Sequence, residues 1–158
     1  MSEIIVSVRD LSKRFGGVVA VDNISFDLAR GSTVGLLGGN GAGKTSTLGM
    51  LLGLLLPSSG GIKIFGEDMI RHRHRVLPWM NFSSPYVDLP HRLTVRENLI
   101  IYGRLYGIRQ IKSRINQLAH DFSLLDFLDR PAGKLSAGQK TRAALAKALL
   151  NEPRLLLL

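Results

Sequence analysis

A glycine-rich segment in the first third of the chain most constrains how it can fold. Residues 38–45 read Gly-Gly-Asn-Gly-Ala-Gly-Lys-Thr and fit the pattern Gly, any four residues, Gly, Lys, Ser or Thr. Glycines let the backbone close into a ring whose N–H groups point at phosphate oxygens, and no Cβ blocks the approach. The apolar run 33–37 predicts a buried strand leading in, and residues 45–56 predict a helix leading out. Such a turn can be mere structure, but the full match in this context predicts a site for ATP or GTP.

The residues expected to contact the nucleotide follow from the chemistry of this loop. Lys44 is expected to reach the β- and γ-phosphates, and the hydroxyl of Thr45 to ligate Mg²⁺. The helix that begins here presents its positive N-terminal end to the same anion. The predicted contacts are Gly38, Gly39, Asn40, Gly41, Ala42, Gly43, Lys44, Thr45 and Ser46.

Length and composition predict about one globular domain. The chain has 158 residues, of which 45% are apolar and 21% charged, which is an ordinary globular balance. It has no cysteine, which excludes disulfides, thiolate metal sites and cysteine nucleophiles and agrees with a cytosolic address. No secretory signal pattern is visible at the start. The longest apolar block, residues 48–56, is about half of a membrane span.

The net charge of +9 raises the question of an anionic partner. Much of this charge is local, because residues 71–75 read Arg-His-Arg-His-Arg. A solvated loop or helix start explains such a run, and contact with lipid headgroups or an acidic partner is the alternative. Nucleic acid is not expected as a partner, because no aromatic residues alternate with the basic ones to stack on bases.

The first part of the chain predicts a β region. Residues 4–8 and 18–28 alternate polar and apolar side chains and predict strands, with a turn over 11–17 between them. A turn at 30–32 leads to a third strand over 32–37, and residues 62–65 predict a short strand after the break at 57–61. The basic run and three prolines predict irregular structure from about 67 to 92.

The second part predicts helices. Thr94 and Glu97 form a capping box that begins a helix extending to about residue 107, and further helical segments are predicted over 109–121 and 124–128. Helices without strands indicate a subdomain inserted into the nucleotide-binding core.

The segment Leu-Ser-Ala-Gly-Gln at 135–139 precedes a predicted helix over 140–150. Ser136 and Gln139 form a second capping box, so this helix end is either a second anion site or an ordinary cap. Residues 155–158 are four leucines and predict a central buried strand.

The phosphate loop, the pentapeptide 135–139 and the apolar strand after its helix together resemble the ATP-binding cassette (ABC) family, in family order and over nearly the whole chain. The resemblance implies an α/β fold: a phosphate-loop NTPase core of ABC type with an N-terminal antiparallel β region and an inserted α-helical subdomain. The whole chain, 1–158, is then a partial ABC ATPase domain. Its expected divisions are the β region and phosphate-loop core (1–66), an irregular segment (about 67–92), the helical subdomain (about 93–135) and the signature helix with the next strand (136–158).

The resemblance also implies roles for residues outside the loop. Phe15 is the candidate for stacking on adenine, and a plain core aromatic is the alternative. In this family two cassettes meet head to tail, and the signature of one contacts the ATP held by the other. The expected signature contacts are Leu135, Ser136, Ala137, Gly138 and Gln139, with Ala137 where the family usually has glycine.

Two departures from the family pattern matter. The glutamine that usually follows the segment 62–65 is missing, and Asn81, Ser83 or Ser84 is expected to stand in, with Asn81 nearest in chemistry. The sequence ends before the place where the family has its acidic pair and switch histidine, so no catalytic residue is expected within this chain. We therefore expect a piece of a longer cassette that binds ATP weakly and hydrolyses it poorly, although a naturally short protein is the alternative.

The function implied by the resemblance is the ATP-binding, energy-coupling subunit of a membrane transporter, with an exporter as the expected class. The complete protein is expected to be an ATPase that uses ATP and Mg²⁺ and lies peripherally on the cytoplasmic face of the membrane. Its expected partners are a second cassette, identical or different, and integral membrane subunits. The alternatives are a soluble ABC-type ATPase in translation or DNA repair and a phosphate-loop kinase or GTPase, which the pentapeptide argues against.

Overall fold

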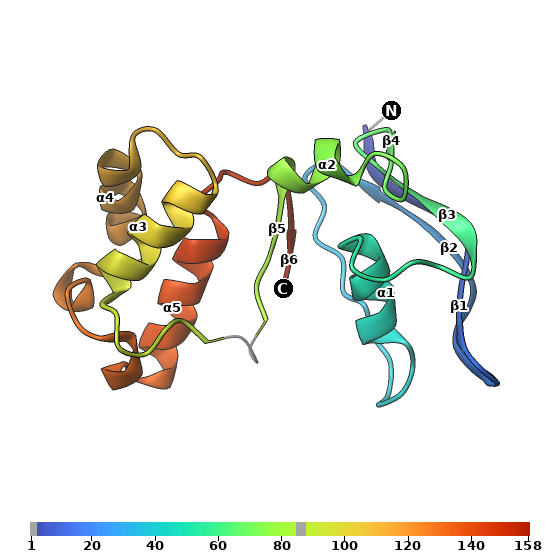
Figure 1. Ribbon diagram of the computed structural model, residues 1–158, viewed down its shortest axis with the longest axis horizontal. Helices are drawn as coiled ribbons and strands as arrows, with labels where there is room; N and C mark the ends of the chain where they lie inside the picture. The colour runs from blue at the N-terminus through green and yellow to red at the C-terminus, as the bar shows by residue number, and fades with distance from the viewer. Residues whose placement is uncertain (1–2, 85–87) are drawn as a thin grey trace. The chain divides into compact units, whose positions relative to one another are not determined.

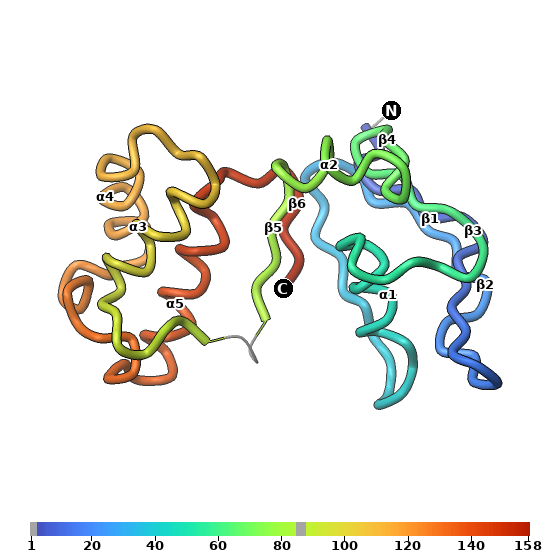
Figure 2. The backbone as a smooth tube through the Cα atoms, in the orientation of Figure 1, coloured from blue at the N-terminus to red at the C-terminus, as the bar shows by residue number. Residues whose placement is uncertain are grey.

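The computed structural model describes residues 3–84 and 88–158. The chain divides into two compact units, Met1–Leu77 and Pro78–Leu158, and Figures 1 and 2 show the elements of each. Of the described helices, none combines the length and the apolar character that crossing a bilayer requires.

An antiparallel sheet dominates the first unit. Its strands are β1 (Ile4–Phe15), β2 (Val18–Ala29), β3 (Ser59–Ile64) and β4 (Glu67–Asp68), in the order β2-β1-β3-β4. The alternation along β1 and β3 places Val6, Val8, Ile62 and Ile64 in the core, each at most 2% exposed. The antiparallel β region expected from the alternating pattern is therefore present.

The turn predicted over residues 11–17 is wrong, because β1 continues to Phe15 and only Gly16 and Gly17 separate it from β2. Val8 and Leu11 are both fully buried although they are three residues apart, which strict alternation does not allow. A register shift lies between them, and Asp10 has a φ of 49°. A β-bulge thus keeps both side chains on the core face and lets the strand continue.

The strand predicted over 33–37 is also wrong. This segment joins no β-ladder in the described part of the chain, and Val34 and Leu37 are 63% and 91% exposed. A strand exists only where a neighbour pairs with its N–H and C=O groups, and apolar composition does not supply that neighbour. The turn before it is present, since the Ser32 N–H donates to Ala29 O at 3.2 Å.

The helix after the glycine-rich loop is α1 (Lys44–Leu51), which is shorter than the predicted 45–56. It buries Thr47, Met50 and Leu51. Gly53 follows its C-cap with a φ of 66°, a conformation that ends helices and that glycine adopts without strain.

The predicted irregular segment 67–92 contains short elements in addition to β4. They are α2 (Arg73–Val76), the 3₁₀ helix Leu77–Trp79 and β5 (Met80–Phe82). β5 pairs in parallel with β6 (Leu155–Leu157). The strand predicted at the end of the chain is confirmed, but its leucines are half-buried instead of buried, and Leu158 is 69% exposed.

Three helices build the core of the second unit: α3 (Val95–Leu105), α4 (Ile111–Asp121) and α5 (Ala137–Ala148), with 3₁₀ helices at Leu125–Phe127 and Ala132–Lys134. The predicted capping box of α3 is confirmed, with Thr94 Oγ1 accepting from the Glu97 N–H at 3.1 Å. Leu99, Ile115 and Leu118 are at most 2% exposed, so α3 and α4 pack through these apolar side chains.

Candidate nucleotide-binding site

The glycine-rich loop is fixed to the sheet at its last glycine. Gly43 is the N-cap of α1 with a φ of 80°, and a Cβ added there would lie 2.1 Å from Ala20 O and 2.9 Å from Val21 Cγ2 of β2. Both the backbone conformation and the close approach exclude a side chain at this position. In Figure 1 the loop before α1 and the turn between β1 and β2 lie at the same end of this unit.

The beginning of α1 presents unpaired backbone donors. The N–H groups of Lys44, Thr45 and Ser46 donate to no acceptor within residues 3–84 and 88–158. No acidic side chain occupies the first turn of this helix. The unpaired donors and the positive helix end can together bind an anion.

The ammonium group of Lys44 is held by its own loop. Nζ donates to Gly38 O and to Gly39 O, both at 2.7 Å. The lysine therefore reaches across the loop where phosphate oxygens are expected. The geometry fits a phosphate ligand whose oxygens replace these two carbonyls as acceptors of the hydrogen bonds from Lys44.

A Mg²⁺ ion bound here would draw few ligands from this chain. Thr45 is exposed at the start of α1, and its hydroxyl is an oxygen donor of the kind that Mg²⁺ takes. No group of three or more His, Cys, Asp or Glu that could hold a metal ion occurs among the described residues. The residues present fit an ion held by Thr45, phosphate oxygens and water.

Phe15 lies at the end of β1, one residue before the turn. It is 49% exposed, so the alternative of a plain core aromatic does not describe it. Lys13 Nζ lies 4.9 Å from the centroid of its ring. An exposed ring with a cation over one face is available for stacking on an adenine base.

The pentapeptide 135–139 lies at the start of α5 in the second unit. The predicted helix over 140–150 begins earlier, at Ala137, so the last three residues of the pentapeptide form its first turn. The predicted capping box is confirmed: the Gln139 N–H donates to Ser136 Oγ at 3.3 Å, and the Ser136 N–H donates to Gln139 Oε1 at 3.0 Å.

The outer face of this helix start is open. Ser136, Ala137 and Gly138 are exposed, and a Cβ at Gly138 would meet nothing within 4 Å. Leu135 beside them is only 8% exposed and anchors the segment in the core. The Ser136 hydroxyl accepts in the cap and keeps its own proton to donate to a ligand.

An ion pair that sequence reasoning missed supports this segment. Lys140 Nζ lies 2.7 Å from Asp88 Oδ2, and His91 Nε2 lies 2.9 Å from the same oxygen. Hydrogen bonds from Lys140 and His91 lower the pKa of Asp88 to about 2. No local signal pointed to this contact, because the partners are 52 residues apart in the chain.

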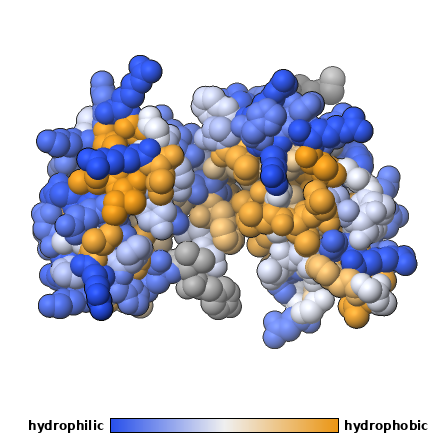
Figure 3. All heavy atoms as spheres, in the orientation of Figure 1, coloured by the Kyte–Doolittle hydropathy of each residue, from blue (hydrophilic) through white to orange (hydrophobic). Residues whose placement is uncertain are grey.

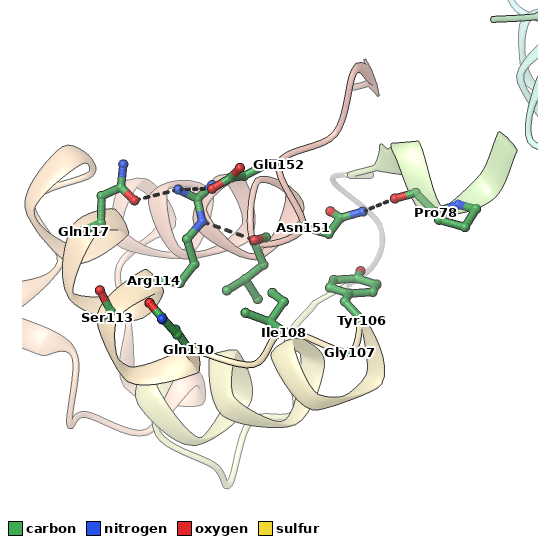
Figure 4. Close-up of a pocket in the computed structure, with 11 residues that line it drawn as sticks. Pro78, Tyr106, Gly107, Ile108, Gln110, Ser113, Arg114, Gln117, Asn151 and Glu152 are labelled. Carbon is green, nitrogen blue, oxygen red and sulfur yellow. Dashed lines mark hydrogen bonds and ion pairs between the residues drawn. The ribbon is translucent and has the colours of Figure 1, made fainter. Parts of the chain in front are cut away.

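Asn81, the expected stand-in for the missing glutamine, is hydrogen-bonded within its own unit. Its Nδ2 donates to Asn151 Oδ1 at 2.8 Å and to the Tyr106 hydroxyl at 3.3 Å, and its Oδ1 accepts from the Phe82 N–H at 2.8 Å. Tyr106 and Asn151 line a cavity of about 410 Å³. Figure 4 shows Arg114, Gln117 and Glu152 turned toward one another in the same cavity.

The antiparallel sheet and the phosphate loop before α1 define a nucleotide-binding protein of the phosphate-loop class. The chain belongs to the ABC transporter family, whose model matches residues 21–158. A solved structure described as the ATP-binding subunit of an ABC transporter matches with a TM-score of 0.84 and 28% identity, over 96% of this chain and 64% of that chain.

Curated relatives carry transport names. The chain is 39% identical to a Nod factor export ATP-binding protein I of Ralstonia nicotianae, over 98% of this chain and 49% of the relative. It is 38% identical to the bacitracin transport ATP-binding protein BcrA of Bacillus licheniformis, over 98% and 50%. It is 40% identical to the spermidine/putrescine import ATP-binding protein PotA of Nitrosospira multiformis, over 98% and 43%. The chain thus spans about half the length of these relatives.

Proposed function

We propose that this chain is the ATP-binding, energy-coupling part of an ABC membrane transporter. The observation that carries the proposal is the loop before α1, where Lys44 and three unpaired N–H groups converge. Four hydrogen-bond donors, one of them the cationic group of Lys44, favour a ligand with several negatively charged oxygens, such as a triphosphate. The transport names of the relatives support the coupling role.

A second copy of the cassette, identical or different, completes the site. Ser136 and Gly138 are exposed at the start of α5, so a bound γ-phosphate of the partner can approach their backbone and hydroxyl groups. ATP then joins the two cassettes, and its hydrolysis releases them. That cycle changes the conformation of membrane subunits because the ligand binds only the closed state tightly.

The contribution of these residues to hydrolysis by the whole protein is positioning and charge stabilisation. Lys44 and the N–H groups at the start of α1 would neutralise and orient the phosphates, and the Thr45 hydroxyl would hold Mg²⁺. Mg²⁺ supplies additional charge neutralisation on the phosphate oxygens when it is bound.

The cavity beside Asn81 is the proposed contact for the membrane subunit. Tyr106 and Asn151 connect the amide of Asn81 to this cavity. A segment of the subunit seated there would act on β5 through these hydrogen bonds. The proposed location is therefore peripheral, on the cytoplasmic face of the membrane.

Export is the proposed direction, in line with the relatives named for Nod factor export. A relative named for import matches at 40% identity, so similarity of the cassette does not separate export from import. The direction of transport must be tested on the membrane subunits. A soluble ABC-type ATPase in translation or DNA repair is the competing function.

The nucleotide part is tested by ATP binding to the wild-type chain and to Lys44→Ala, with Lys63→Ala on β3 as the control. Loss of one charge-assisted contact should lower ATP affinity roughly 10- to 100-fold in Lys44→Ala and leave the control unchanged. Equal affinity of the two variants for ATP would contradict the site.

The transport part is tested on the full-length protein purified from membranes. Recovery with an integral membrane protein, reduced by Tyr106→Ala but not by Lys44→Ala, is the expected result. Sedimentation with ribosomes or binding to DNA without a membrane partner would instead favour the soluble alternative.

A further inference from the structure

A cavity between the end of α3 and the start of α4 is the strongest feature that the proposed function leaves unused. It measures about 450 Å³ and shares no lining residue with the loop before α1. Its lining consists of two isoleucines, three cations and two neutral polar residues: Ile100, Ile111, Arg104, Arg109, Lys112, Gln110 and Ser113.

The three cations of this cavity have no acidic partner within residues 3–84 and 88–158. None of Arg104, Arg109 and Lys112 forms an ion pair with a carboxylate in the part of the chain that the structure describes. Unpaired cations around one cavity favour an anionic ligand, and guanidinium groups match phosphate oxygens in geometry.

The position of two of these cations is unfavourable for the helix. Arg109 and Lys112 flank the start of α4, which has no acid in its first turn and no side-chain cap. Positive charge near a helix N-terminus opposes the helix dipole. Their unfavourable placement adds to the case made by the cavity and its unpaired cations.

The apolar residues of the cavity indicate which chemical group is attached to the anion. Ile100 and Ile111 are half-buried aliphatic walls, and among the described residues no aromatic ring lines the cavity to stack on a base. Nearby on α3, Ile101 and Leu105 are 44% and 74% exposed and lie four residues apart on one side of the helix. Figure 3 shows a hydrophobic area over α3 and α4 that hydrophilic residues cross and border.

We propose that the cavity lined by Arg104, Arg109 and Lys112 binds the phosphate headgroup of an anionic membrane phospholipid. The cations bind the phosphate diester, the isoleucines contact the glycerol and the first methylenes, and Ile101 and Leu105 enter the adjacent apolar layer. Apolar contact together with attraction to anionic lipids is the usual basis of peripheral membrane binding. This contact is independent of nucleotide and of the integral membrane partner.

The test is co-sedimentation of the chain with phosphatidylcholine vesicles that contain or lack phosphatidylglycerol. We expect binding only to the anionic vesicles. The triple substitution R104Q/R109Q/K112Q should lower it roughly 100-fold, since each basic residue near an anionic surface contributes about fivefold. The matched control is R92Q/R130Q/K134Q, which removes three exposed positive charges of the same unit that do not line the cavity, and it should retain most of the binding.

Two further measurements keep the result interpretable. The melting temperature of R104Q/R109Q/K112Q should stay close to that of the wild type, because losing Arg109 and Lys112 removes unfavourable charge from the start of α4 whereas losing Arg104 removes favourable charge from the last turn of α3. The chain should also bind soluble dihexanoyl phosphatidylglycerol more tightly than glycerophosphoglycerol, because only the former carries acyl chains that contact Ile100 and Ile111.

Three outcomes would overturn the proposal. Equal losses in the two triple variants would mean that net charge alone attracts the vesicles. Binding of polyglutamate in place of vesicles, with the same dependence on Arg104, Arg109 and Lys112, would assign the cavity to an acidic protein segment. Binding of dihexanoyl phosphatidylglycerol without vesicle binding would assign it to a soluble phosphorylated amphiphile.

Discussion

Lys140 Nζ lies 2.7 Å from Asp88 Oδ2, which ties the first turn of α5 to the segment that precedes α3. His91 shares the same carboxylate oxygen at 2.9 Å. The first turn of α5 carries the proposed contact with a second cassette. Its orientation therefore depends on a residue far away in the sequence.

Replacing Asp88 by Asn should remove a pH-dependent part of the stability. The pKa of Asp88 falls from 3.8 to about 2 on folding, so its stabilising contribution is present above pH 3.8 and is lost as the pH falls toward 2. The Lys140 and Asp88 side chains are 34% and 42% exposed, so solvent screens their interaction. We therefore expect the pair to contribute about 1 kcal/mol or less to the free energy of unfolding at neutral pH. Urea unfolding at several pH values measures this.

Asp126→Asn is the control for that series, because Asp126 is an exposed aspartate with no ion pair among the described residues. The wild type and this control should lose stability in parallel between pH 3.8 and 2, whereas Asp88→Asn should lose less. An identical acid dependence of all three would remove the role given to the Asp88–Lys140 pair.

Gly43→Ala should destabilise the first unit and impair ATP binding. The new Cβ would lie 2.1 Å from Ala20 O, and the φ of 80° is costly for alanine. We expect a loss of about 2 kcal/mol or more in the free energy of unfolding. Gly39→Ala is the matched control, since its Cβ would meet nothing within 4 Å and its φ is not positive; its unfolding free energy should change little.

Arg114→Met should weaken the second unit. The guanidinium is 14% exposed and donates to Leu149 O at 2.6 Å and Leu150 O at 3.2 Å, at the end of α5. Two partly buried carbonyls would lose a charged donor, which costs about 2 kcal/mol. Denaturant unfolding measures the loss, and Arg109→Met, at an exposed arginine, should leave stability almost unchanged. Equal effects of the two substitutions would rule out this capping role.

Thr94→Ala and Ser136→Ala should each cost about 1 kcal/mol, because each removes the acceptor of a helix capping box. Their effects on nucleotide-dependent dimerisation should differ. Only Ser136→Ala removes a hydroxyl proposed to contact the partner's ATP, so sedimentation velocity with ATP should show weaker dimers for this variant alone. The same dimerisation for both variants would count against the signature assignment.

Features set by neighbours in the sequence were predictable. Both capping boxes depend on residues three positions apart, and both are present. The glycine-rich loop before a helix and the antiparallel β region also follow from local patterns. The family resemblance based on these segments is confirmed by the match over residues 21–158.

Features that depend on distant partners were not predictable. The run 33–37 has the composition of a strand but finds no pairing partner, whereas the three residues of β5 lack a pattern and pair with β6. The bulge between Val8 and Leu11 keeps both side chains buried but interrupts the alternation of polar and apolar residues. The alternation therefore did not predict that β1 continues. Asp88 and Lys140 meet only because the helices between them fold.

The two hydrogen bonds from Lys44 to Gly38 O and Gly39 O satisfy the ammonium group within its own loop. A ligand replaces these two carbonyls only if its oxygens attract the Lys44 ammonium group more strongly than the carbonyl oxygens do. A single weakly charged anion gains little from this exchange, whereas a triphosphate gains at several oxygens at once. Lys44 therefore favours highly charged ligands over weakly charged ones, independently of their shape.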